Sequence, residues 1–206
     1  MATTKRPIDE HQLKRLLAFV GGPPRFSLGL ASYDDHRQCE EIVNQLAQLA
    51  AQKNISITTL ELAPGETRLL HRLQEHLNDA QQNTLGAIGN SSASADPETV
   101  SQQSTGGQAT SGTRRAVMVT GIEKALDYLS LEADRESPSL FGLANISRDA
   151  FSKLVPVPIV LWLMPAAFAL LARFAPDFWH WRAATFDFTG PEPDRRRRED
   201  ELLGFD

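Results

Sequence analysis

The sequence contains a single cysteine, Cys39, among its 206 residues. One thiol cannot form an intrachain disulfide, and thiolate zinc sites need several cysteines. A disulfide framework and a cysteine-based metal centre are therefore excluded. The first residues, MATTKRPIDEHQ, also lack the apolar stretch of a secretory signal. We expect a reducing, cytoplasmic location.

An excess of positive charge is also missing. The chain has 21 lysines and arginines against 26 acidic residues, which gives a net charge of −5. General nucleic-acid binding depends on a basic face that neutralises phosphates. The longest basic run, Arg195 to Arg198, is flanked by Asp194 and Glu199 and is interpreted as a self-compensating charged segment. We therefore expect no nucleic-acid partner.

Residues 90–113 contain one large apolar residue, Val100, among serine, threonine, glutamine, glycine and alanine. Such a segment cannot bury enough surface to offset its ordering entropy. We therefore expect one domain over residues 1–189 with a disordered internal loop at about 80–114. Residues 190–206 are expected to form a charged, flexible tail.

Outside these segments, helical and strand patterns alternate. Apolar residues recur at helical spacing in residues 8–20, 39–52 and 69–78, and the apolar segments typical of strands are 25–33, 55–62, 115–123, 159–164 and 184–188. Further helices are expected at 124–131, 147–154 and 165–175, with a polar loop before Ser147. This order predicts an α/β fold: a three-layer sandwich around a mostly parallel five-stranded sheet.

The longest uncharged run, LVPVPIVLWLMPAAFALLA (Leu154 to Ala172), would pass a hydropathy test for a membrane span. Its three prolines, Pro156, Pro158 and Pro165, argue against one continuous helix, because proline removes a hydrogen bond and clashes with the preceding turn. A buried strand followed by a helix that begins at Pro165 fits all three. We favour this interpretation over a membrane anchor, which stays as an alternative.

Several segments together resemble a known family: RFSLGLASYDD, AVMVTGIE, LANISRDAFSKL, VPVPIVLWLMPAAFALLARFAPDFWHWR and ATFDF. They are similar to the N-terminal NTPase-like module of bacterial STAND-type proteins, AAA-related signal-transduction ATPases often fused to tetratricopeptide repeats. The resemblance covers about residues 9–188 outside the loop. It implies a sheet of P-loop NTPase type. In that sheet RFSLGLASY would take the place of the Walker A strand, AVMVTGIE would take that of the Walker B strand, and PIVLWLM would take that of the sensor strand.

The nucleotide motifs of that family are degenerate here. A Walker A loop, G-x-x-x-x-G-K-[ST], needs glycines that turn backbone N–H groups onto the phosphates and a lysine that neutralises them. The corresponding stretch after Gly29 lacks the second glycine, the lysine and the hydroxyl residue, and Asp34 and Asp35 would repel phosphate. The Walker B aspartate is also absent, although Glu123 follows that strand. We predict a pseudo-NTPase that is not an enzyme and carries no cofactor or metal.

Three polar residues are weak candidates for a nucleotide-binding role: Glu123, Asn145 and Arg148. The simpler interpretation of Glu123 is an exposed residue in the first turn of a helix. For Asn145 and Arg148 the functional interpretation is that they hold two elements together or face a partner. The simpler interpretation is that Asn145 ends a turn and that Arg148 is exposed. His36 follows two aspartates, a pattern more typical of a capped helix start than of a metal site.

A protein partner or self-association is the expected mode of action. Tryptophan and arginine dominate binding hot spots, so the candidates for partner contacts are Phe178, Trp179, Trp181 and Arg182, although these aromatic residues also suit core packing. A second candidate is a short docking motif in the tail, formed by Leu202, Leu203 and Phe205.

The expected function is therefore a non-catalytic adaptor or regulatory subunit. The resemblance places such modules in bacterial signalling or defence systems, and the chain has no room for the repeats found in that family. One alternative is a nucleotide-binding domain with an atypical phosphate site. A membrane-anchored protein is the other.

Overall fold

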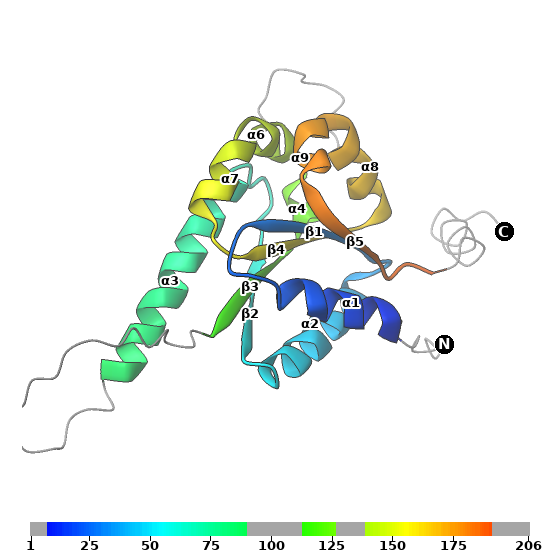
Figure 1. The fold of residues 1–206 in the computed structure, drawn as a ribbon. Coiled ribbons are helices and arrows are strands. Elements are labelled where there is room, and N and C mark those ends of the chain that lie inside the picture. Colours follow the sequence, from blue (N-terminus) through cyan, green and yellow to red (C-terminus); the bar gives the residue numbers. More distant parts are fainter. Residues whose placement is uncertain (1–7, 90–112, 127–138, 191–206) are drawn as a thin grey trace, which may run out of the picture.

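The computed structural model describes residues 8–89, 113–126 and 139–190. In this part of the chain, five strands form one sheet in the order β2-β3-β4-β1-β5 (Figure 1). The strands are β1 (Ser27–Ser32), β2 (Ile55–Glu61), β3 (Arg114–Thr120), β4 (Pro158–Leu163) and β5 (Arg182–Asp187). All four strand pairs are parallel. The predicted five-stranded parallel sheet is confirmed, and it is consistent with a P-loop NTPase-type fold.

Helices cover both faces of the sheet (Figure 1). The helices α1 (Glu10–Val20) and α2 (His36–Ala51) lie on one face. The other face carries α3 (Leu69–Gly89), α4 (Ile122–Ala125), α6 (Leu140–Ile146), α7 (Arg148–Leu154), α8 (Pro165–Phe174) and α9 (Pro176–His180). The predicted three-layer sandwich is therefore confirmed.

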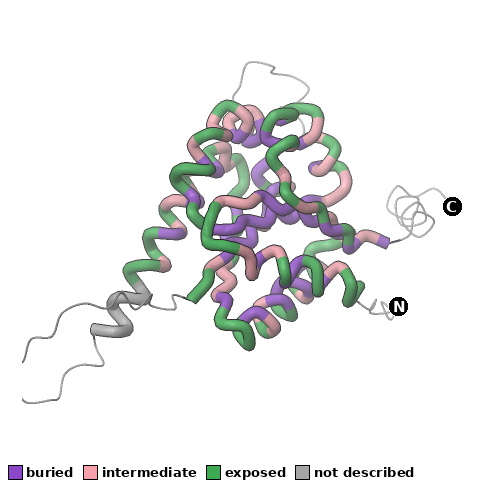
Figure 2. The backbone as a smooth tube through the Cα atoms, in the orientation of Figure 1, coloured by how far each residue is buried: buried purple, intermediate pink, exposed green. Residues whose placement is uncertain are grey.

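The strand β4 is buried along its whole length, as Figure 2 shows for the centre of the sheet. Ile159, Leu161 and Leu163 pack into the core beneath α3 and α6 to α9, whereas Val160 and Trp162 pack into the core beneath α1 and α2. Successive side chains of a strand point to opposite faces, so a strand covered on both faces must be apolar throughout. This burial explains the unbroken apolar run in the sequence.

The prolines of that run lie where the sequence predicted. Pro158 begins β4, and Pro165 occupies the first turn of α8, where a missing N–H costs no hydrogen bond. The run is therefore a strand and a helix, as predicted. Among the described residues, none of the helices has the length and apolarity needed to cross a bilayer.

The prediction for the internal loop was wrong at its amino-terminal end. The helix α3 continues to Gly89, past the expected end near Asn78 and into the range 80–114 that was expected to be a loop. Extending an existing helix by one residue costs far less than nucleating a new one, so a helix can continue past the end of its clearest apolar pattern. Residues 90–112 and 191–206, which hold the rest of that loop and almost all of the predicted tail, lie outside the described residues.

Two short helices were missed. The expected polar loop before Ser147 contains α6, whose N-cap Ser139 accepts a hydrogen bond from the backbone N–H of Gly142 at 3.0 Å. The helix α9 follows α8 after one residue, Ala175. Helices of this length show less than two full turns of periodicity, so a pattern search does not detect them. The helix expected at 124–131 is described only to Ala125, and residues 127–138 lie outside the described part.

Candidate functional site

The carboxyl ends of β1 and β4 mark a switch point in the sheet. The two strands are neighbours, but the chain leaves β1 through α2 on one face and leaves β4 through α8 on the other. Ligands of open α/β sheets bind at such points, outside the carboxyl ends of the strands. The residues that follow these strands are therefore the main candidates for a ligand-binding site.

The connection after β1 is short. Three residues, Tyr33, Asp34 and Asp35, separate the end of β1 at Ser32 from the start of α2 at His36. Gly29, which the sequence placed at the beginning of the Walker A-like turn, lies inside the strand instead. A Cβ atom at Gly29 would come within 2.9 Å of the Phe19 ring. This glycine therefore permits α1 to pack on β1.

The amino-terminal end of α2 is capped by an acidic side chain, and a second one lies beside it. Asp35 is the N-cap, and its Oδ1 accepts a hydrogen bond from the backbone N–H of Gln38 at 2.9 Å, as the sequence predicted. The Oδ2 of Asp34 accepts from the backbone N–H of Gly190 at 2.8 Å. A helix N-terminus attracts phosphate through its free N–H groups and its dipole. Here the carboxylate of Asp35 occupies that place.

Glu123 does not have the exposed position that the sequence indicated. Its Oε2 accepts a hydrogen bond from the Tyr33 hydroxyl at 2.9 Å, and its Oε1 accepts from the backbone N–H of Met164. The interpretation as a solvent-exposed first-turn residue was wrong, because the start of α4 brings this side chain over the ends of β1 and β4. Glu123 therefore joins three elements at the switch point.

Tyr33 is a site residue that the sequence analysis missed. Its side chain is fully buried, with its ring centroid 6.4 Å from that of Trp162, and its hydroxyl also lies 3.3 Å from Nδ1 of His36. Trp162 in turn stacks on Phe188 at 5.6 Å. An aromatic side chain therefore fills the space directly after β1. The one signal in the sequence was a tyrosine between a strand and two aspartates.

Asn145 and Arg148 hold helices together. The Oδ1 of Asn145 accepts a hydrogen bond from the backbone N–H of Phe178 at 3.0 Å, which links α6 to α9. Arg148 forms an ion pair with Asp177 at 3.2 Å, which links α7 to α9. Of the interpretations that the sequence left open, the inter-element contact is confirmed. Asn145 lies inside α6 and does not end a turn.

The aromatic residues near α9 differ in exposure. Phe178 is fully buried and packs on Phe151, so its side chain offers no surface to a partner, contrary to the sequence-based proposal. Trp179 packs edge-on against Phe168, and the Arg182 guanidinium lies 4.1 Å from its ring centroid. Trp181 is 36% exposed. The other proposed docking residues, Leu202, Leu203 and Phe205, lie outside the described residues.

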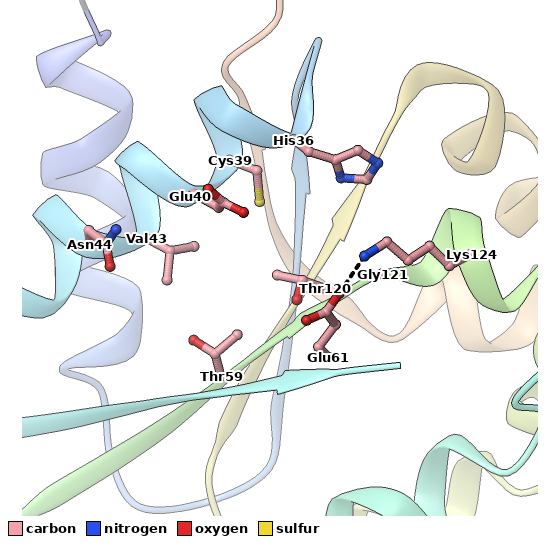
Figure 3. Close-up of a pocket in the computed structure, with 10 residues that line it drawn as sticks. All are labelled: His36, Cys39, Glu40, Val43, Asn44, Thr59, Glu61, Thr120, Gly121 and Lys124. Atoms are coloured by element: carbon pink, nitrogen blue, oxygen red, sulfur yellow. Dashed lines mark hydrogen bonds and ion pairs between the residues drawn. The ribbon is translucent and has the colours of Figure 1, made fainter. Parts of the chain in front are cut away.

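A cavity of about 260 Å³ lies beside the switch point, between α2 and the carboxyl ends of β2 and β3 (Figure 3). Glu40 and Asn44 of α2 face Thr59 of β2 across it. At one side Glu61 of β2 forms an ion pair with Lys124 of α4. This pair lowers the pKa of Glu61 and raises the pKa of Lys124. In the described ranges, groups of histidine, cysteine and acidic residues suited to a metal ion are absent.

Cys39 of α2 also lines this cavity, and its side chain is buried. Burial raises the pKa of its thiol to about 12, and the carboxylates of Glu123, Glu40 and Asp35 act in the same direction. Burial and nearby negative charge both disfavour the thiolate, which is the reactive form. The thiol is therefore protected from chemistry that a low-pKa cysteine would perform.

We expect Cys39 to resist thiol reagents in the folded protein. The shift of the pKa from 9.0 to about 12 lowers the thiolate fraction near pH 8 by about a thousandfold. Labelling with Ellman's reagent is expected to be slower than that of a short peptide by about this factor, and to become fast in denaturant. Rapid labelling of the native protein at pH 8 would contradict the burial of Cys39.

The chain matches no family model and no curated protein. Among solved structures it is similar to the Aeropyrum pernix ORC2 protein, described in ADPNP–ADP complexes, at 9% sequence identity and a TM-score of 0.41. The alignment covers 94% of this chain and 50% of that protein, so the chain spans about half of its length. This similarity is too low to carry an argument about function.

Proposed function

We propose that this protein is a non-catalytic module with a degenerate NTPase-like fold, which acts as an adaptor or regulatory subunit through contacts with protein. The observation that carries the proposal is the three-residue connection between β1 and α2. A Walker A loop requires G-x-x-x-x-G-K-[ST] at this place. Tyr33, Asp34 and Asp35 leave no room for such a loop, and they provide neither its glycines nor its lysine.

The contacts of Glu123 support the same proposal. A glutamate that activates water in a phosphoryl-transfer site must face the nucleophile, together with a metal ion and cationic groups that hold the phosphates. Both oxygens of Glu123 accept hydrogen bonds from the protein instead, from Tyr33 and from the backbone of Met164. We therefore assign Glu123 a structural role.

The carboxyl-terminal helices are the surface on which we place the partner. In the part of the chain that the structure describes, four large hydrophobic side chains are at least 36% exposed: Ile146, Leu154, Phe174 and Trp181. They lie at or directly after the carboxyl ends of α6, α7, α8 and α9. Contiguous exposed apolar patches mark protein interaction surfaces, and we propose that these four side chains contribute to one.

Nucleotide binding provides the first test. We expect ATP and ADP at millimolar concentration, with and without magnesium, to leave the melting temperature unchanged, because a ligand stabilises a protein only when it binds the folded state. The thermal shift would be checked by isothermal titration calorimetry. Saturable binding of either nucleotide would contradict the proposal and favour the alternative, a nucleotide-binding domain with an atypical phosphate site.

The interaction surface is tested separately by sedimentation velocity. If a second copy is the partner, the wild-type chain associates with rising concentration, and Ile146→Ser with Trp181→Ser shifts it to monomer without changing its circular dichroism. A chain that stays monomeric overturns self-association and leaves a different protein as the partner. In that case the same two substitutions are expected to abolish binding to the identified partner.

A further inference from the structure

Several of the polar side chains that line the cavity between α2 and the ends of β2 and β3 have no protein partner among the described residues. Within the described part of the chain, Glu40 forms no ion pair or hydrogen bond, and the side chains of Asn44, Thr59 and Thr120 form no hydrogen bonds. Figure 3 shows Glu40 and Asn44 on α2 opposite Thr59 and Thr120 on the strands. Val43 of α2 adds an apolar side chain to this lining, and convergent polar groups beside apolar ones are typical of small-ligand sites.

The charges of this cavity favour a cation. Two carboxylates, Glu40 and Glu61, line it together with one lysine, Lys124, whose ammonium group already pairs with Glu61. Burial is the main cause of the raised pKa of the Cys39 thiol, and the nearby carboxylates of Glu123, Glu40 and Asp35 raise it further. An anion entering the cavity would be repelled by these groups, whereas a cation would gain charge-assisted hydrogen bonds.

The size of the cavity restricts the ligand further. Its volume of about 260 Å³ lies just below the range of roughly 300–1,000 Å³ that is usual for ligand pockets. A ligand of this size is a small molecule or a single side chain. The acceptors on the walls, which are the carboxylate of Glu40, the amide oxygen of Asn44 and the two threonine hydroxyls, suit a head group with several N–H donors.

We propose that this cavity binds the guanidinium or alkylammonium head of a small organic cation, with Glu40 as the charged anchor and with Asn44, Thr59 and Thr120 as hydrogen-bonding groups. The same head group occurs in free amines and in the arginine side chain of a peptide. The site does not depend on the interaction surface at α6 to α9, so it can exist whether or not the adaptor role is correct.

The test uses the full chain and three probes: agmatine, the blocked tripeptide acetyl-Gly-Arg-Gly-amide, and N-butylurea as a neutral control. We expect saturable binding of agmatine in roughly the millimolar range in NMR titrations, since so small a ligand has few contacts to contribute. The amides of Asn44, Thr59 and Thr120 should move. Binding should weaken as salt is added. Tripeptide binding at the same amides would assign the head group to a peptide as well as to a free amine.

Two variants and a matched control make the test specific. Glu40→Gln is expected to lower the affinity for agmatine by roughly tenfold or more, because it removes the charged acceptor. Glu41→Gln makes the same charge change one residue along α2 at a carboxylate that pairs with Arg37 and does not line the cavity, so the affinity should stay near that of the wild type. Thr59→Tyr fills the cavity from an exposed strand position that tolerates aromatic residues and should abolish binding.

Three results would overturn the proposal. These are the absence of saturable shifts with both cationic probes, equal losses in the Glu40 and Glu41 variants, and binding of N-butylurea as tight as that of agmatine. Equal losses would mean that general surface charge attracts the probe. Binding of the neutral control would mean that charge recognition has no part.

Discussion

Replacement of Trp162 by alanine is expected to lower the free energy of unfolding by about 3–5 kcal/mol, the range typical of large aromatic residues removed from a core. Trp162 is fully buried in the central strand β4, between the Tyr33 ring and the stacked ring of Phe188. Its indole N–H also donates to Sδ of Met118 at 3.4 Å. Alanine would leave a cavity beneath α1 and α2, and a small domain has little stability in excess of this loss.

The measurement is equilibrium unfolding in urea, followed by circular dichroism, with the slope m compared between variants. Trp181→Ala is the matched control, because that tryptophan is 36% exposed and lies outside the sheet. This variant should lose clearly less free energy of unfolding than Trp162→Ala. Trp162→Phe keeps an aromatic ring, so its loss of free energy of unfolding should lie between those of Trp162→Ala and Trp181→Ala. This variant preserves the test if Trp162→Ala does not fold. Equal losses for Trp162→Ala and Trp181→Ala would contradict the position of Trp162 in the core.

Glu123→Ala should have the next largest effect, a loss of about 2–4 kcal/mol, because it leaves two donors without their acceptor in a partly buried region. These donors are the Tyr33 hydroxyl and the backbone N–H of Met164. The loss would weaken the junction of β1, α4 and β4. A catalytic glutamate that faced solvent would give a different result, since its removal costs little stability.

Three further variants separate the contributions, again by urea unfolding. Glu123→Gln keeps one carbonyl acceptor and should lose less than Glu123→Ala. Tyr33→Phe keeps the buried ring and removes one donor, so we expect a loss of about 1 kcal/mol. Glu61→Ala removes another carboxylate near the cavity, but its ion pair with Lys124 lies at the surface and should contribute little. A Glu123→Ala variant as stable as Glu61→Ala would contradict the structural role.

The fold class was predictable because it depends on local patterns. Pro158 and Pro165 divide the apolar run into strand and helix wherever the segment lies, since a proline ring restricts its own backbone and removes one donor. The N-cap role of Asp35 has the same origin, because it depends on the next three residues of the chain. The missing Walker A residues could likewise be read directly from the sequence.

The contacts of the candidate site were not predictable in this way. Glu123 and Tyr33 are 90 positions apart, and the bond between Phe178 and Asn145 spans 33 positions. Periodicity within one element carries no information about which side chains meet across the sheet. The burial of Phe178 is a similar case, since a helix of five residues does not reveal which of its sides faces the core.

The sequence by itself therefore determined the alternation of helices and strands, the burial of β4 and the absence of a G-x-x-x-x-G-K-[ST] pattern after β1, because each of these is a property of neighbouring residues. Only the tertiary structure decided the role of Glu123, which the sequence indicated as exposed, and the position of the polar cavity beside it. Both arise where the carboxyl ends of parallel strands meet at one edge of the sheet. That edge is assembled from segments that lie far apart in the chain, and its charges and hydrogen bonds exist only once they are packed together.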